Sequence, residues 1–169
     1  MNYLNFEIVR IYAGWFDVKF TTEEKQVEIS ASDAWGNDSP RNFLKMLCNL
    51  ADNKTSNRYV VFDEEPGTYV VHIEKGAVCK FSILYSEYDY DKWPEVKMCG
   101  ERKLEEVETM IPGMEELFIV TDFSLEAFAR TVVRGFEEYF SVETRAEYEG
   151  NWMEFPEKEF LELRDRFNF

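Results

Sequence analysis

The amino-acid sequence predicts an α+β fold with an antiparallel sheet of about six to seven strands, curved or in two layers. The sheet is built from two meanders and is covered by three helices on one side. Three observations predict it. Residues 58–85 contain three runs rich in Val, Ile, Phe and Tyr, with turn residues between them. Residues 16–31 largely alternate apolar and polar side chains. Residues 124–140 repeat apolar side chains every three or four positions, which is the period of a helix.

The first meander is predicted near the N-terminus. Residues 5–11 are apolar-rich and extended in character, and Ala13-Gly14 supplies a break. Apolar residues alternate with polar ones over residues 16–20 and again over residues 27–31, which is typical of strands with one buried face. The polar residues 22–25 form the turn between these two strands.

A helix is predicted after a loop at residues 33–38. Ser39-Pro40 is a helix start, because serine can cap free N–H groups and proline is tolerated at the first helical position. Apolar residues then follow at helical spacing for about 12 residues. They are Phe43, Leu44, Leu47, Cys48 and Ala51.

The second meander occupies residues 58–85. Glu65-Pro66-Gly67 and Glu74-Lys75-Gly76 interrupt its apolar runs, since proline lacks an N–H donor and glycine adopts positive φ. In the middle strand, Val71 points to one face and His72 to the other. The meander therefore has two distinct faces.

Beyond the second meander the pattern changes from strands to helices. Residues 101–110 fit either a charged helix or an edge strand, and residues 117–120 are predicted as a short buried strand. Ser124 caps the longest predicted helix, which runs to Phe140 and packs its apolar face on the sheet. A last helix begins near Pro156.

Composition bounds the class of protein. The 169 residues fit one domain spanning residues 1–169, and the 17% of aromatic residues are enough for a sizeable core. The net charge of −15, from 34 acidic and 19 basic residues, repels nucleic-acid phosphates and anionic membrane surfaces and would speed association with a basic protein partner. The alternative is an ordinary acidic surface, which is common in soluble bacterial proteins. The sequence has no apolar run of about 18 residues and no signal-peptide pattern at its start, so we expect a cytoplasmic protein.

The sequence gives little support to metal or cofactor chemistry, and none is predicted. Cys48, Cys79 and Cys99 are widely spaced and odd in number, and His72 is the only histidine. This spacing argues against a disulfide framework and against a Cys/His zinc site. It predicts reduced thiols, two of them in the core.

One acidic stretch is a candidate for catalysis. Asp63, Glu64 and Glu65 lie beside a turn, and paired carboxylates can do acid–base work when their environments separate their pKa values. Three acids in a row are more typical of a solvated turn. His72 is a candidate general base, but it has no partner at a recognisable motif spacing, which favours a surface or half-buried strand residue.

A second acidic stretch is a candidate for binding a partner. Aspartates alternate with aromatic residues there, and the first candidates are Asp89, Tyr90, Asp91 and Trp93. Tyrosine and tryptophan are favoured at protein interfaces, and acidic charge around them speeds association with a basic partner. The alternative is an ordinary loop whose aromatic side chains fold back onto the core.

Three short motifs resemble small bacterial proteins, some of which are similar to the immunity proteins of polymorphic or contact-dependent toxins. They are Asp33-Ala34-Trp35 before a helix, Glu65-Pro66-Gly67-x-Tyr69 between strands, and Tyr148…Trp152…Phe155-Pro156 before the last helix. The resemblance implies an acidic cytosolic binder, not an enzyme, that blocks or displaces a toxin domain, often a basic nuclease. It carries over no binding residue, because such surfaces diverge with their toxins.

The charge, the acidic-aromatic stretch and the resemblance together predict a non-enzymatic, immunity-type protein that neutralises a basic toxin domain by occluding its surface. Two alternatives stay open. A deep pocket that gathers Asp63, Glu64 and His72 would favour a small enzyme with a carboxylate/His site. A large apolar cavity would favour a regulatory domain that binds a small molecule.

Overall fold

Strands and helices alternate in blocks along the chain, as an α+β fold requires. A computed structural model describes residues 1–88, 97–111 and 113–169. The strands are β1 (Asn5–Tyr12), β2 (Trp15–Thr21), β3 (Gln26–Ser32), β4 (Asn57–Asp63), β5 (Thr68–Lys75), β6 (Cys79–Ser86), β7 (Cys99–Gly100) and β8 (Glu115–Phe123). The helices are α1 (Ser39–Ala51), α2 (Leu104–Met110), α3 (Leu125–Val142), α4 (Arg145–Asn151) and α5 (Glu157–Arg166), with a 3₁₀ turn at Ala34–Gly36.

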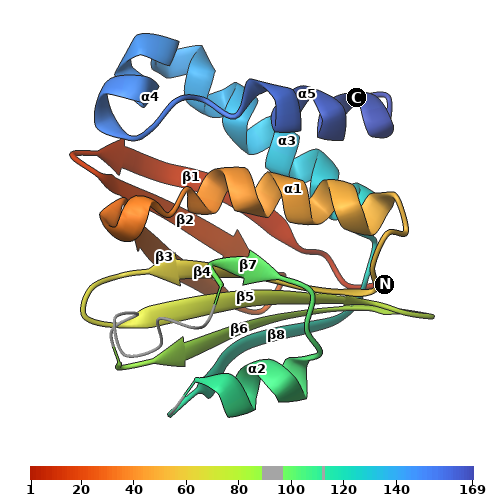
Figure 1. Ribbon diagram of the computed structural model, residues 1–169. Coiled ribbons are helices and arrows are strands. Elements are labelled where there is room, and N and C mark those ends of the chain that lie inside the picture. Colours follow the sequence, from red (N-terminus) through yellow and green to blue (C-terminus); the bar gives the residue numbers. More distant parts are fainter. Residues whose placement is uncertain (89–96, 112) are drawn as a thin grey trace.

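The strands form two antiparallel sheets. The first has the order β1-β2-β3, and the second has the order β7-β4-β5-β6-β8. Both predicted meanders are confirmed as hairpin-connected strands. Figure 1 shows α1, α3, α4 and α5 gathered on one side of the strands, whereas α2 lies beyond the five-stranded sheet.

The position of α2 corrects the prediction that all helices cover one side. The five-stranded sheet has a second apolar face that includes Val61, Val70 and Leu84, and all three side chains are buried. Leu104 and Val107 of α2 pack against this face. Because an apolar sheet face exposed to water is unfavourable, the helical alternative for this charged stretch is the one that the fold uses.

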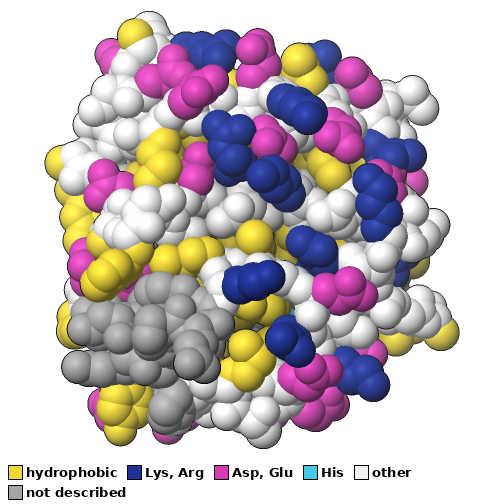
Figure 2. Space-filling model, viewed as in Figure 1, with side chains coloured by type: hydrophobic (Ala, Val, Ile, Leu, Met, Phe, Trp, Pro, Cys, Tyr) yellow, Lys and Arg dark blue, Asp and Glu magenta, His cyan; other side chains and the backbone are white. Residues whose placement is uncertain are grey.

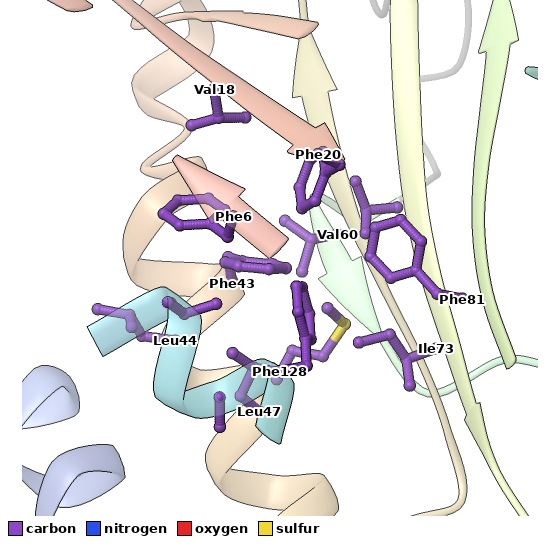
Figure 3. Packing of buried hydrophobic residues seen from close by; sticks show 14 of the residues in the cluster. Phe6, Val18, Phe20, Phe43, Leu44, Leu47, Val60, Ile73, Phe81 and Phe128 are labelled. Carbon is purple, nitrogen blue, oxygen red and sulfur yellow. The ribbon is translucent and has the colours of Figure 1, made fainter. Parts of the chain in front are cut away.

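Aromatic side chains join the two sheets and the helices into one core. Figure 3 shows Phe6 and Phe20 from the first sheet meeting Phe43 of α1, Phe81 of β6 and Phe128 of α3. Ring centroids lie 5.0 Å apart for Phe20 and Phe81, and 5.6 Å apart for Phe81 and Phe128. Such pairs add about 0.5–1.5 kcal/mol each beyond the area they bury.

The start of α1 differs from the prediction in one residue. Asp38, not Ser39, is the N-cap, because its Oδ1 accepts a hydrogen bond from the Arg41 N–H at 3.3 Å. The Ser39 hydroxyl donates instead to the Val61 carbonyl oxygen at 2.9 Å and so ties the helix to β4. The predicted cap of α3 is confirmed, since Ser124 Oγ accepts from the backbone N–H of Ala127 at 3.1 Å.

The C-terminal segment contains a helix that the sequence did not predict. Thr144 and Glu147 form a reciprocal capping box at the start of α4. Farther along, the Trp152 Nε1–H donates to Asp38 Oδ1 at 3.1 Å, which ties the segment to the start of α1. The last helix begins at Glu157, directly after Pro156, as predicted.

The strand predicted over residues 117–120 is buried on one face only. Phe118 and Val120 of β8 are buried, but Leu117 is 50% exposed. The predicted strand is confirmed as part of β8, but its burial is limited to one face. Among the helices of the described ranges, none has the length and apolar character needed to cross a membrane.

Candidate functional site

The predicted acidic-aromatic patch lies outside the described residues. Asp89, Tyr90, Asp91 and Trp93 all fall in the gap between residues 88 and 97. On the N-terminal side of the gap, the carbonyl oxygen of Tyr88 accepts a hydrogen bond from Thr68 Oγ1 at 3.1 Å. This bond holds Tyr88 beside the first residue of β5.

The predicted carboxylate/His site is not assembled. In the antiparallel register of β4 and β5, Asp63 is opposite Thr68, whereas His72 is opposite Tyr59. Asp63 and His72 are thus separated by four positions along the strands, or about 13 Å. Both residues are buried, Asp63 completely and His72 to 1% exposure, so the predictions of a solvated turn and of a surface histidine are wrong at these two positions.

His72 makes a structural contact with the segment that leads into α2. Its Nε2 lies 2.8 Å from the carbonyl oxygen of Arg102. In the neutral tautomer that carries its proton on Nε2, the ring donates a hydrogen bond to this oxygen. Burial is the main cause that lowers the pKa of His72 below its ordinary value. A neutral, buried donor of this kind anchors a backbone segment, which is how His72 helps to hold α2 on the sheet.

The face that carries α1 and α5 is mixed in charge. Figure 2 shows Lys and Arg side chains interspersed with Asp and Glu over this face. Arg41 illustrates the pairing, because its guanidinium contacts Asp38 at 3.1 Å and Glu159 at 2.9 Å. In ion pairs of this kind, acidic and basic side chains of the face neutralise each other.

An open groove of about 520 Å³ runs beside β1. One wall is the strand itself, over residues 7–12. The opposite wall is built by the C-terminal end of α3 and by α4, and its lining residues are Gly135, Glu138, Tyr139, Val142, Glu143, Glu147 and Asn151. In Figure 1, β1 is the strand of the first sheet that lies nearest to these helices.

The rim of the groove is acidic. Glu7 projects from the strand, and Glu138, Glu143 and Glu147 project from the helical wall. Arg10 is the only Lys or Arg among the described lining residues. These carboxylates make the groove a place where a positively charged group gains Coulomb energy.

Arg10 of β1 is paired with a carboxylate of the neighbouring strand, β2. Its Nε donates to Asp17 Oδ2 at 2.6 Å, and its guanidinium carbon lies 4.4 Å from the centre of the Tyr12 ring. The hydrogen bond to Asp17 is the main cause that raises the pKa of Arg10. Arg10 therefore offsets Asp17 rather than the carboxylates of the rim, of which Glu7 pairs with Lys19 at 3.2 Å.

Two rim carboxylates are close enough to interact. The Glu147 carboxylate accepts a hydrogen bond from the backbone N–H of Thr144 at 2.6 Å, which lowers the pKa of Glu147. Its hydrogen bond with the neighbouring Glu143 raises the pKa of Glu143. Two acids held side by side repel each other when both are ionised, and a bound cation would relieve that repulsion.

Apolar side chains are exposed beside the carboxylates. Val9 is 44% exposed, Tyr12 41% and Val142 81%. Val9 owes its exposure to a β-bulge, since the register of β1 against β2 shifts between Ile8 and Arg10. Exposed apolar residues rimmed by polar ones are a mark of protein interaction sites.

The sequence did not predict this groove. The alternation of β1 is broken by the bulge, so its exposed face is not visible in the pattern, and α4 was not expected at all. The usable signal was the acidic pair Glu137-Glu138 on the outer face of the predicted long helix. No triad of His, Cys, Asp or Glu side chains suited to holding a metal ion is found in the described ranges.

Comparison with known proteins identifies no relative for this chain. No protein-family model, no curated protein and no solved structure matches it.

Proposed function

We propose that the protein is a non-enzymatic, acidic binding protein of the immunity type, which neutralises a basic toxin domain by covering part of its surface. The observation that carries the proposal is the groove beside β1, where four carboxylates surround exposed apolar side chains. Charged rims speed the encounter with a partner of opposite charge, and apolar anchors supply affinity once the two surfaces meet.

The net charge supports the same class of partner. A chain with a formal charge of −15 is repelled by phosphate backbones and attracted to basic proteins. The motif resemblance described above narrows the partner to a toxin domain. The patch at Asp89, Tyr90, Asp91 and Trp93 stays part of the proposal as a second contact region, on the strength of its composition.

The separation of Asp63 and His72 argues against the rival enzyme. General acid–base catalysis needs the two groups within hydrogen-bond reach of one substrate, and four strand positions keep them too far apart. The groove also differs from a small-molecule site, which is concave, mostly apolar and able to bury most of its ligand.

The test is protection from the toxin. The chain is co-expressed with the C-terminal domain of the protein encoded beside its gene, and growth is compared with and without the chain. Purified partners are then titrated at low and at high salt. We expect restored growth and binding that weakens as salt rises. Growth that is not restored, together with no binding to the products of neighbouring genes, would overturn the proposal.

A further inference from the structure

β1 is the outermost strand of its sheet, and its outer edge carries backbone groups that β2 does not use. Phe6 marks the outward direction, because its N–H points away from β2 and donates to Thr131 Oγ1 of α3 at 3.2 Å. Along an antiparallel strand, successive residues turn their N–H and C=O groups to opposite edges. The backbone N–H and C=O groups of Ile8 therefore also point away from β2.

Beyond the bulge, β1 again turns backbone N–H and C=O groups away from β2. The turn Ala13-Gly14 has positive φ at both residues, and Tyr12 opposite Trp15 closes this two-residue hairpin with hydrogen bonds to β2. One position earlier, Ile11 must point its N–H and C=O outward. Ile8 and Ile11 thus present backbone groups along the edge of β1 that lines the groove.

The outer edge of β8, unlike that of β1, has backbone carbonyl groups that accept hydrogen bonds from other parts of the chain. There the Lys25 ammonium donates to the carbonyl oxygen of Ile119 at 2.7 Å. The backbone N–H of Asn2 donates to the carbonyl oxygen of Asp122, also at 2.7 Å. Within the described ranges, the stretch of β1 from Ile8 to Ile11 has no comparable cover on its outer edge. Such an edge is a template for an added strand.

We propose that an extended, lysine- or arginine-bearing segment of the partner protein adds to β1 as a further antiparallel or parallel strand and lies in the groove. Glu138 and Val142 lie one turn apart on α3 and both line the groove, so the helical wall offers a carboxylate and an apolar side chain to the added segment. The inference rests on the proposed function, because it names how the basic partner is held.

The probe is a short, capped peptide of alternating lysine and valine. Its matched control has the same sequence with N-methyl groups on alternate backbone amides, which keeps the charge and removes strand hydrogen bonds. We expect the plain peptide to bind and to slow the amide hydrogen exchange of Ile8 and Ile11. We expect the N-methylated peptide to bind at least about tenfold more weakly, a difference of about 1.4 kcal/mol.

Charge variants locate the peptide in the groove. Glu138→Lys combined with Glu143→Lys should weaken binding by about tenfold or more. Glu137→Lys is the control, because Glu137 is exposed on the same helix but does not line the groove. Its effect should stay within about twofold.

Three outcomes would overturn strand addition. They are equal binding of the two peptides, no binding of the plain peptide, and binding that leaves the exchange of Ile8 and Ile11 unchanged. The proposed function is judged separately by the co-expressed toxin domain. A chain that restores growth but fails the peptide test would keep the immunity role and lose the strand-addition mode. A chain that binds the peptide but does not restore growth would keep the mode and lose the immunity role.

Discussion

Gly135 of α3 lies directly against Phe6 of β1. A Cβ atom at position 135 would stand 2.9 Å from Phe6 Cδ1 and 3.4 Å from the Phe6 carbonyl oxygen. The missing side chain lets the helix approach the strand at Phe6. Gly135 is also one of the residues that line the groove beside β1.

Gly135→Ala should destabilise the protein. Overpacking of this kind costs about 1–3 kcal/mol, which exceeds the gain of up to about 1 kcal/mol from replacing glycine inside a helix. Gly150→Ala in α4 is the control, since a Cβ atom there meets nothing within 4 Å. Urea unfolding should show a loss for the first variant and an unchanged or higher free energy for the second. A stabilised Gly135→Ala protein would contradict the close approach.

Phe136→Ala should remove a large part of the stability. Phe136 is 1% exposed, and its ring lies 5.8 Å from that of Phe160 and 6.3 Å from that of Phe6. Truncating a buried phenylalanine costs about 3–5 kcal/mol, out of a total of about 5–15 kcal/mol for a typical domain. Chemical denaturation measures the loss. Val142→Ala on the same helix is the control, and its effect should be small because Val142 is exposed.

The stability of the protein should depend on pH through His72. Because burial lowers the folded-state pKa below the ordinary value of 6.5, the unfolded chain takes up a proton first as pH falls. The contribution of neutral His72 is therefore complete above the unfolded pKa and is lost as pH drops toward the folded pKa. Glu74 and Glu105 act in the opposite direction, raising the pKa, but more weakly than burial.

His72→Gln isolates this effect, since glutamine can donate to the Arg102 carbonyl oxygen but does not titrate. The free energy of unfolding should fall more steeply for the natural protein than for the variant between about pH 7 and about pH 5. Parallel curves would show that His72 titrates alike in both states.

The three cysteines should differ in reactivity toward a thiol reagent. Cys48 and Cys79 are buried, as predicted for two of the thiols, and Cys99 is half-buried. Burial raises the pKa of Cys48 to about 12 and also raises that of Cys79, so little of either is thiolate at neutral pH. Alkylation followed by peptide mass analysis should label Cys99 first. Cys48 labelled at the same rate as Cys99 in the folded protein would contradict its burial.

Local patterns in the sequence determined most of the secondary structure. The alternation in β2 and β3, the apolar runs of β4 to β6 and the helical period of α3 each follow from which side chains one element must turn toward a core. The capping role of Ser124 also needs no tertiary information, because its partner is the N–H of Ala127 three residues later.

Only the tertiary structure decided what covers each face. His72 points away from the main core, as its strand position predicts, yet it is buried because α2 covers that face. Ser39 fits a helix cap, but its hydroxyl donates to the Val61 carbonyl oxygen, and Asp38 caps the helix instead. Gly135, which lines the groove, meets Phe6 from a distant part of the chain. A periodic pattern specifies the direction of a side chain, whereas burial and binding depend on which distant segment arrives there.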